Sequence, residues 1–392
     1  MEYVLLVRYA EIHLKGLNRP YFERALVDRL KGALRPLKVR IVREQGRIFV
    51  FGIPATEVEN AITRVSRVFG VHSVSPALAV EKDFAVIERA AKRLVQDALD
   101  NGAGHTFKVL ARRADKRFPM RSDEINRELG GRLLDAFPVL SVDVHKPEMK
   151  VGVEIRQEQA FLYVREIPAV GGMPVGCNGH AMLLISGGID SPVAGYMIAK
   201  RGVGLSAVHF YSYPYTSEKA RDKVVDLTRI VAGYAGDIDL YLVPFTDIQL
   251  TIYEKCPQSE TTILMRRMMM RLAEHFARET GSQALVTGEA IGQVASQTIE
   301  SMTATEAVVK LPVFRPLIGF DKEEIIERAQ KIGSFDTSIL PYEDCCTVFV
   351  PNHPVTKPKV ETLEESEKMA DFAPLIEKAI AETEVVHVSA RE

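Results

Sequence analysis

The chain has 392 residues, of which 46% are hydrophobic and 26% charged, a composition typical of a globular protein with two or three domains. Its apolar runs are far shorter than the roughly 18 residues that a membrane span needs, and its first residues lack the features of a secretory signal. Four cysteines are too few for a disulfide scaffold, so we expect a reduced, cytoplasmic protein with no membrane segment.

Charge is distributed unevenly along the chain. Residues 1–175 carry 29 Lys and Arg against 22 Asp and Glu, whereas residues 176–392 carry 21 against 30. A basic front half joined to an acidic back half fits a nucleic-acid-binding part coupled to a part that handles small molecules. Chance variation among solvated surfaces explains the charges equally well, so this interpretation needs support from motifs.

The first predicted domain spans residues 1–75. Its hydrophobic positions follow the order strand, helix, two strands, helix, which is typical of a ferredoxin-like unit. Asn18 and Pro20 mark the start of the first helix, as the N-cap and a first-turn residue. The strands are predicted over residues 3–8, 38–43 and 47–52, and the second helix contains Val58, Ala61, Ile62 and Val65.

The second predicted domain spans residues 76–168 and carries a cluster of basic residues around Phe118 and Pro119. Its apolar spacing predicts helices over 84–99 and 123–136 and strands over 106–112, 151–156 and 160–165.

The third predicted domain spans residues 182–392 and follows a Gly-rich linker over 169–181. Strands and helices alternate in it, which predicts a parallel sheet flanked by helices. An acidic tail after about residue 360 has a helical pattern. The predicted strands cover 182–186, 204–210, 239–244 and 283–287, and the helices cover 191–201, 218–233 and 260–279.

The most informative motif is the string SGGIDS over residues 186–191, between an apolar strand and a helix. Two glycines let the backbone approach a ligand closely, and the N–H groups at a helix start favour an anion. We expect Ser191 to cap the helix, with Pro192 in its first turn. No Lys follows as in a Walker-type loop. An Asp at this position suits an ATP site that releases pyrophosphate and holds a magnesium ion.

This string resembles the PP-loop of the N-type ATP pyrophosphatases. Its surroundings, LLISGGIDSPVAGY (183–196), are similar to the tRNA 4-thiouridine synthetases, the ThiI family, as are HFYSYPYTSEKA (209–220), LVTGEAIGQVASQT (285–298), RPLIGFDKEEII (315–326) and PYEDCCTVFVP (341–351). RYAEIHLKGLNR (8–19) resembles the family's ferredoxin-like domain, and FKVLARRADKRFPMRSDEINRELG (107–130) resembles its RNA-binding THUMP domain. The resemblance implies a multidomain α+β and α/β protein: a ferredoxin-like domain, a THUMP domain and a PP-loop domain of the adenine nucleotide alpha hydrolase type.

The resemblance also implies an activity. Family members use ATP to adenylate O4 of uridine 8 in tRNA, and sulfur from a cysteine persulfide then displaces AMP. Lys322 matches a lysine used in this chemistry, and Asp190 would hold Mg²⁺. The residues implied to bind ATP are Leu184, Ile185, Ser186, Gly187, Gly188, Asp190, Ser191, His209, Phe210, Arg266, Gly288 and Gln297. His209 could instead be a satisfied histidine at the edge of the core, and Arg266 one more charge on a helix.

Cys345 is our choice for the catalytic sulfur carrier, and Cys346 competes with it. The adjacent acidic residues oppose the low pKa that a thiolate needs. The thiol that resolves the persulfide could be Cys256, Cys346 or Cys177, although adjacent cysteines close only a strained ring. Many relatives continue into a rhodanese domain; this chain resembles the short form, so we expect a cysteine desulfurase to load Cys345 directly. The iron–sulfur cluster of some relatives is doubtful, because Ser259 stands where their second cysteine would be.

The resemblance implies that tRNA binds the basic segment of the THUMP-like region, mostly through phosphates, and that two chains form a homodimer. The residues expected to contact tRNA are Lys108, Arg112, Arg113, Lys116, Arg117 and Arg121. Two other classes remain open: a PP-loop ligase or amidotransferase for a small molecule, and a tRNA-binding module with a degenerate loop.

Overall fold

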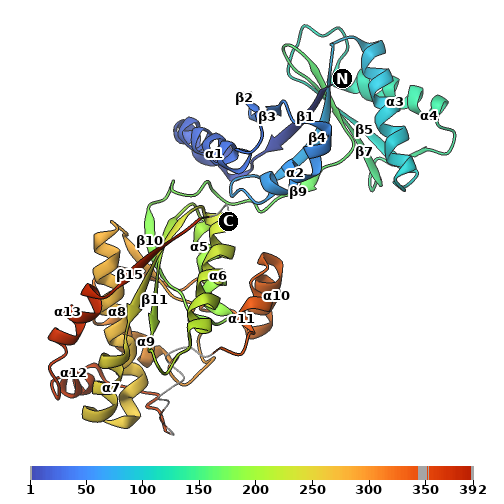
Figure 1. Ribbon diagram of the computed structural model, residues 1–392. Helices are drawn as coiled ribbons and strands as arrows, with labels where there is room; N and C mark the ends of the chain where they lie inside the picture. Colours follow the sequence, from blue (N-terminus) through green and yellow to red (C-terminus); the bar gives the residue numbers. More distant parts are fainter. Residues whose placement is uncertain (1, 343–350, 352, 390–392) are drawn as a thin grey trace. The chain divides into compact units, whose positions relative to one another are not determined.

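The structure is a computed structural model that describes residues 2–342, 351 and 353–389 (Figure 1). The chain divides into two compact units, Met1–Pro174 and Val175–Glu392, and the division falls inside the predicted linker. The mixed sheet of the first unit and the largely parallel sheet of the second confirm the predicted fold class.

The first unit is built on one nine-stranded sheet with the order β2-β3-β1-β4-β8-β7-β5-β6, and β9 pairs with β4. Neighbouring strands are antiparallel, except that β5 is parallel to both β6 and β7. The ferredoxin-like and THUMP-like regions therefore share a sheet. Its strands are β1 (Glu2–Arg8), β2 (Arg40–Glu44), β3 (Arg47–Phe51), β4 (Ser73–Val80), β5 (Thr106–Arg113), β6 (Ser141–Val142), β7 (Met149–Ile155), β8 (Ala160–Tyr163) and β9 (Ile167–Pro168).

Strand β4 joins the two halves of this sheet, and the sequence analysis does not predict it. Pro76 lies opposite Leu5 in the ladder with β1. On its other side, β4 pairs with β9 at Ser73 and Val74 and with β8 only from Leu78 onward. Pro76 thus has a strand neighbour on one side, where a residue without an N–H is tolerated. The boundary predicted between residues 75 and 76 falls within this strand.

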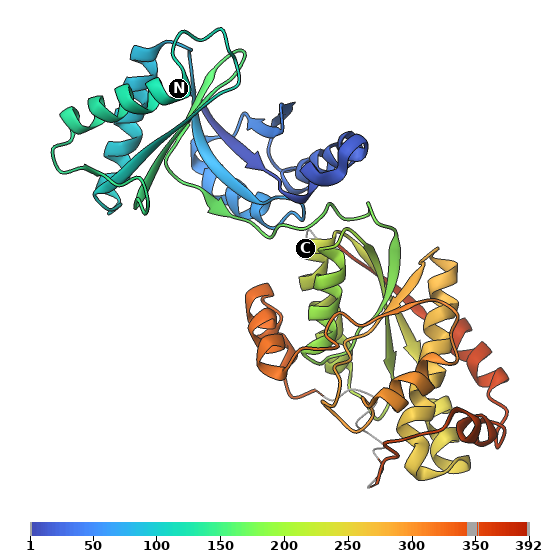
Figure 2. The ribbon, with the colours of Figure 1, turned by 180° about the vertical axis from the view of Figure 1, so that it is seen from behind.

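The helices of the first unit lie against this sheet (Figure 2). Helices α3 and α4 bury Ile87, Ile125 and Leu129 against Phe107 and Val109 of β5. Since strand residues alternate between faces, Lys108, Leu110 and Arg112 belong to the opposite face. Asn18 occupies the predicted N-cap position of α1, with no side-chain cap bond. The helices are η1 (Glu11–Asn18), α1 (Arg19–Ala33), η2 (Ala55–Glu57), α2 (Val58–Ser66), α3 (Phe84–Asp100) and α4 (Ser122–Ala136).

The second unit is built on a six-stranded sheet with the order β14-β13-β10-β11-β12-β15. All strand pairs are parallel except β12 with β15, which is antiparallel. Strand β15 belongs to the tail after residue 360, for which the sequence predicted helix. The first strand, β10, lies between β11 and β13. The order in which strands are added across the sheet therefore reverses at β10, and ligands bind open α/β sheets at such a switch point. The strands are β10 (His180–Leu184), β11 (Gly204–Tyr211), β12 (Ile238–Pro244), β13 (Ala284–Val286), β14 (Val313–Phe314) and β15 (Glu384–Val388).

Helices cover both faces of this sheet (Figure 1). Helices α5, α6, α10 and α11 lie on one face and contact one another, and α7, α8, α9, α12 and α13 lie on the other. In the described residues, no helix is long and apolar enough to cross a membrane. The helices are α5 (Asp190–Ala199), α6 (Glu218–Ala235), α7 (Thr246–Lys255), η3 (Gln258–Glu260), α8 (Thr261–Glu279), α9 (Ile299–Glu306), α10 (Lys322–Ile332), α11 (Phe335–Ser338), α12 (Val360–Glu367) and α13 (Ala373–Ala381).

Candidate functional site

The loop between β10 and α5 folds back on itself through two serines. The Ser186 N–H donates to Ser191 Oγ at 2.9 Å, and the Gly188 N–H donates to Ser186 Oγ at 3.3 Å. Helix α5 begins at Asp190 with Ile189 as its N-cap, so the prediction that Ser191 caps it is wrong. The side chain of Ser191 instead reaches back to Ser186 and shapes the loop.

Asp190 is the meeting point of three segments that are distant in the sequence. Its Oδ1 accepts a hydrogen bond from Lys322 Nζ at 2.7 Å, and its Oδ2 accepts one from Gln293 Nε2 at 2.9 Å. Lys322 opens α10 directly after Asp321, the N-cap of a capping box with Glu324. The fold therefore brings together two of the three predicted catalytic residues, Asp190 and Lys322, and adds Gln293, which the sequence analysis missed.

Gly288 brings a second loop against the first turn of α5. A Cβ at this position would lie 2.8 Å from Ser191 N and 2.9 Å from the Asp190 carbonyl carbon. The loop that follows β13 thus packs directly on the backbone of the phosphate loop. Close backbone approach is a role that glycine alone fills, which agrees with its predicted place in the site.

Arg266 is tied to this second loop by a buried carboxylate. Its guanidinium bonds Glu289, which is 4% exposed, and donates through Nη1 to the Ser296 carbonyl at 2.9 Å. Arg315 Nε binds the other oxygen of Glu289 at 2.7 Å. Burial pushes the pKa of Glu289 up, but the charges of Arg266 and Arg315 outweigh it and hold that pKa below its ordinary value.

Gln297 closes the same loop. Its Oε1 accepts from the Ala290 N–H at 3.4 Å, and its carbonyl accepts from the Gly292 N–H at 2.9 Å. Arg266, Gly288 and Gln297 therefore meet around one segment, as their shared role predicts. The sequence analysis missed Glu289 and Arg315. Arg315 directly follows β14 and Glu289 lies three residues after β13, and a position at the carboxyl end of a parallel strand is the signal that could have identified both.

Three predicted nucleotide residues are packed into the sheet. The side chains of Ile185, His209 and Phe210 are buried, and His209 Nδ1 lies 3.1 Å from the Ile185 carbonyl oxygen. Phe210 stacks edge-on against Phe245 with ring centroids 5.5 Å apart. Leu184, the last residue of β10, packs partly buried against the same core. These contacts agree with the alternative of a satisfied core histidine.

The predicted sulfur carriers Cys345 and Cys346 lie outside the described residues. Of the other two cysteines, both unbridged, Cys256 is buried with its Sγ 3.4 Å from the Ser366 carbonyl, and Cys177 is half-buried. Burial raises the pKa of the Cys256 thiol, and Glu260 and Glu367 add to this effect. Cys256 is therefore poorly suited to act as a thiolate in this conformation.

The predicted RNA-binding cations differ in their surroundings. Arg113 Nη1 donates to the Phe118 carbonyl at 3.0 Å, and Arg117 Nε pairs with Asp115 at 3.0 Å. Lys108 Nζ donates to the Val144 carbonyl at 3.1 Å. These bonds shape the loop after β5. Exposed cations that pair with no residue in the described ranges are Arg112, Lys116 and Arg121.

Comparisons with known proteins place this arrangement among described relatives. Family models described as Thiamine biosynthesis protein (ThiI), ThiI ferredoxin-like domain and THUMP domain match residues 176–372, 4–75 and 81–165. A probable tRNA sulfurtransferase of Acetivibrio thermocellus is 55% identical over 99% of this chain and 100% of its own length. Another, of Alkaliphilus oremlandii, is 50% identical over 99% of both chains. The crystal structure of a 4-thiouridine synthetase–RNA complex with bound ATP is 40% identical, covers 99% of this chain and 100% of its own, and matches with a TM-score of 0.92.

The packing of Gly288 generates a first prediction. In Gly288→Ala, the new Cβ meets backbone atoms of Asp190 and Ser191 that cannot rotate away, an overpacking that costs about 1–3 kcal/mol. We expect a lower melting temperature and weaker ATP binding by calorimetry. Gly319→Ala is the control, because its Cβ would meet nothing within 4 Å. Equal ATP affinities in the two variants would contradict the proposed contact.

The pairing of Glu289 with Arg266 and Arg315 generates a second prediction, and Glu367, which also pairs with two arginines, is the control. Glu367 is held in the same way by Arg267 and Arg271 of α8, at 2.6 Å and 2.7 Å. Removing one partner of such buried groups costs about 3–5 kcal/mol at most, so Glu289→Gln and Glu367→Gln should both lower stability. Only Glu289→Gln should also raise the KM for ATP, because only it frees Arg266. An unchanged KM would show that Glu289 is purely structural.

Proposed function

Because the chain belongs to the ThiI family and is an ATP-dependent tRNA sulfurtransferase, we propose that it converts uridine 8 of tRNA to 4-thiouridine. The observation that carries this proposal is the convergence of Asp190, Lys322 and Gln293 on a glycine loop at the switch point of a parallel sheet. Such a loop supplies backbone N–H groups and cations to a triphosphate.

We propose that ATP activates the base before sulfur arrives. O4 of uracil attacks the α-phosphorus of ATP, and pyrophosphate leaves. The adenylated oxygen then departs from C4 with AMP, which turns a poor leaving group into a good one. The loop backbone around Gly187 and Gly188 would bind the phosphates, and Lys322 would offset the charge of the departing pyrophosphate.

Asp190 fits a magnesium ion that arrives with the nucleotide. Mg²⁺ is commonly bound through one or two carboxylates together with substrate phosphates. Among the described residues, no group of three or more His, Cys, Asp and Glu side chains could hold a metal ion. When bound, the ion would neutralise phosphate charge. Lys322 and Gln293 keep the Asp190 carboxylate oriented for it.

We propose that sulfur reaches C4 from a persulfide on Cys345, loaded by a cysteine desulfurase. The terminal sulfur attacks C4 as AMP leaves, which joins C4 to Cys345 through two sulfur atoms. A second thiol then breaks the sulfur–sulfur bond, releasing 4-thiouridine and forming a disulfide with Cys345 that a dithiol reductant reopens. Cys346, Cys177 and Cys256 stay as candidates, of which Cys256 would first have to leave its buried position.

For the RNA we propose the first unit as the docking surface. Arg112, Lys116 and Arg121 are exposed, while Lys108, Arg113 and Arg117 shape the segment that presents them. Phosphate contacts of this kind position a tRNA without reading its sequence. We propose a homodimer and a cytoplasmic setting for the reaction, as for an enzyme that acts on tRNA.

The proposed reaction is tested by incubating the protein with unmodified tRNA, ATP, Mg²⁺, L-cysteine and a desulfurase, and following absorbance of thiolated uridine. We expect Asp190→Asn to release no pyrophosphate and Cys345→Ala to release it without forming thiouridine. A small-molecule ligase would turn over ATP without tRNA, and a degenerate binding module would release no pyrophosphate at all. Full thiolation by Cys345→Ala would move the sulfur carrier elsewhere.

The proposed RNA surface is tested by reversing two exposed charges. Arg112→Glu with Lys116→Glu should weaken tRNA binding and reduce the slope of log affinity against log salt by about 1.4–1.8, at about 0.7–0.9 per phosphate contact. Arg89→Glu with Arg93→Glu, on helix α3, makes the same charge change and should leave both quantities unaltered. If the two double variants bind tRNA alike, the docking surface lies outside the loop after β5.

A further inference from the structure

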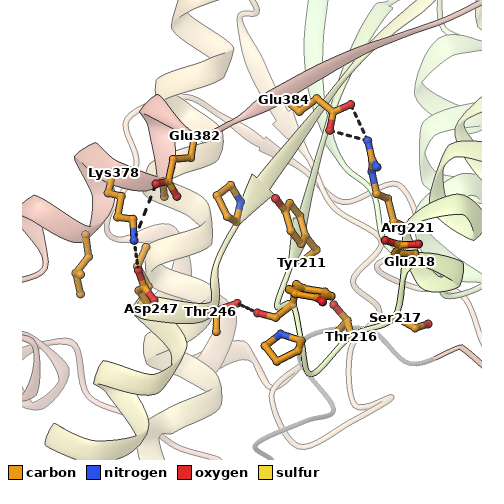
Figure 3. Close-up of a pocket in the computed structure, with 16 residues that line it drawn as sticks. Tyr211, Thr216, Ser217, Glu218, Arg221, Thr246, Asp247, Lys378, Glu382 and Glu384 are labelled. Atoms are coloured by element: carbon orange, nitrogen blue, oxygen red, sulfur yellow. Dashed lines mark hydrogen bonds and ion pairs between the residues drawn. The ribbon is translucent and has the colours of Figure 1, made fainter.

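A cleft of about 630 Å³ opens at the carboxyl ends of β11 and β12, beside α13 and β15 (Figure 3). Tyr211 and Tyr213 line it, and Tyr213, from the loop after β11, is 65% exposed; Tyr215 in the same loop is 49% exposed but lies outside the lining. Tyrosine is enriched at protein–protein contacts, because it combines a large apolar ring with a polar end. None of the phosphate-loop residues 186–191 lines this cleft.

Two ion pairs form opposite sides of the cleft (Figure 3). Arg221 Nη2 contacts both oxygens of Glu384 at 2.6 Å, and Lys378 Nζ contacts Asp247 Oδ2 at 2.8 Å. Each cation of the lining is therefore already neutralised. Thr246 Oγ1 donates to the Tyr213 carbonyl at 2.8 Å and fixes the tyrosine loop across the cleft.

The remaining charge of the cleft is negative. Four carboxylates line it, Glu218, Asp247, Glu382 and Glu384, against the two cations Arg221 and Lys378. Glu218 and Glu382 are exposed, and Lys378 Nζ, which Asp247 approaches to 2.8 Å, lies 4.0 Å from Glu382 Oε1, so that two carboxylates share this one cation. A polyanion such as tRNA is repelled by this lining, whereas a segment bearing lysine or arginine is attracted.

The cleft also lies on the helix that anchors the segment leading to the paired cysteines. The first turn of α6 contributes Glu218 and Arg221 to the cleft. On the next face of α6, the buried Lys223 donates to the Leu340 carbonyl at 2.8 Å, and Lys219 Nζ lies 5.8 Å from the centre of the Tyr342 ring. Tyr342 is three residues before Cys345. A protein seated in the cleft would thus contact α6, the helix that also binds Leu340 and Tyr342.

We propose that this acidic, tyrosine-lined cleft is the docking surface for the protein that delivers sulfur, through a lysine- or arginine-bearing segment beside its persulfide. The inference rests on the proposed function, which requires a donor to reach Cys345. Charge complementarity selects the partner, and the exposed tyrosines supply the apolar contact.

The test compares two sources of sulfur for Glu218→Lys with Glu382→Lys. One source is a cysteine desulfurase charged with L-cysteine, which loads Cys345. The other is inorganic sulfide, whose sulfur attacks the adenylated C4 directly as AMP leaves, so that it needs neither the Cys345 persulfide nor docking. We expect the desulfurase concentration for half-maximal thiolation to rise about tenfold, since reversing interfacial charges weakens encounter. The thiolation rate with sulfide should be unchanged. Glu361→Lys with Glu364→Lys, exposed on α12, is the matched control and should behave as wild type with both sources.

Three outcomes would overturn the docking surface. The first is an unaltered desulfurase concentration for half-maximal thiolation, and the second is an equal fall in thiolation with sulfide. The third is a changed KM for tRNA with an unaltered desulfurase concentration, which would assign the cleft to RNA. Tyr213→Ala provides a second variant without a charge change, and it should also raise the desulfurase requirement alone. Failure of wild type to thiolate tRNA from either source would refute the proposed function itself.

Discussion

The contact on which the site depends is the ion pair between Asp190 and Lys322. It joins the first residue of α5 to the first residue of α10, which lie 132 positions apart in the sequence. Both helix starts are the positive ends of helix dipoles, which favour an anion between them, although the capping box of Asp321 and Glu324 already pairs part of the α10 start. Gln293 ties a third segment to the same carboxylate. The three segments therefore meet at Asp190 only when the phosphate loop, the start of α10 and the loop after β13 are docked together.

Sequence reasoning found the parts of this site that are local and missed those that depend on docking. The glycine loop and Asp190 were predicted from the motif between a strand and a helix, whereas Lys322, Gly288 and Gln297 were predicted from the family resemblance of their motifs. Glu289, Gln293 and Arg315 were missed because their partners are set by packing between elements. Ser191 was assigned as a cap from its position, but the loop preceding the helix competes for its hydroxyl.

The same distinction between local pattern and long-range pairing holds in the fold. Alternating elements of the second unit were predicted with small boundary errors, because strands buried on both faces and amphipathic helices carry strong local patterns. Strand β4 was missed because serine and proline obscure its pattern, and β15 because it pairs with β12 across the whole unit. Cys345 was predicted from resemblance alone, and it lies outside the described residues, so no local contact supports or opposes it.

Electrostatics explains why carboxylates can line a site for a polyanion. An unpaired Asp190 or Glu289 would repel phosphate, yet Lys322 neutralises the first, and Arg266 and Arg315 bracket the second. The buried pairs of Glu289 contribute little net stability, because desolvation offsets their attraction, and the exposed pair of Asp190 with Lys322 contributes little because water screens it. Their effect is to fix geometry: they hold the loops at one distance from α5 while leaving the site neutral or positive. Glu218 on the tyrosine-lined cleft differs from both, because its carboxylate is exposed and pairs with no cation among the described residues.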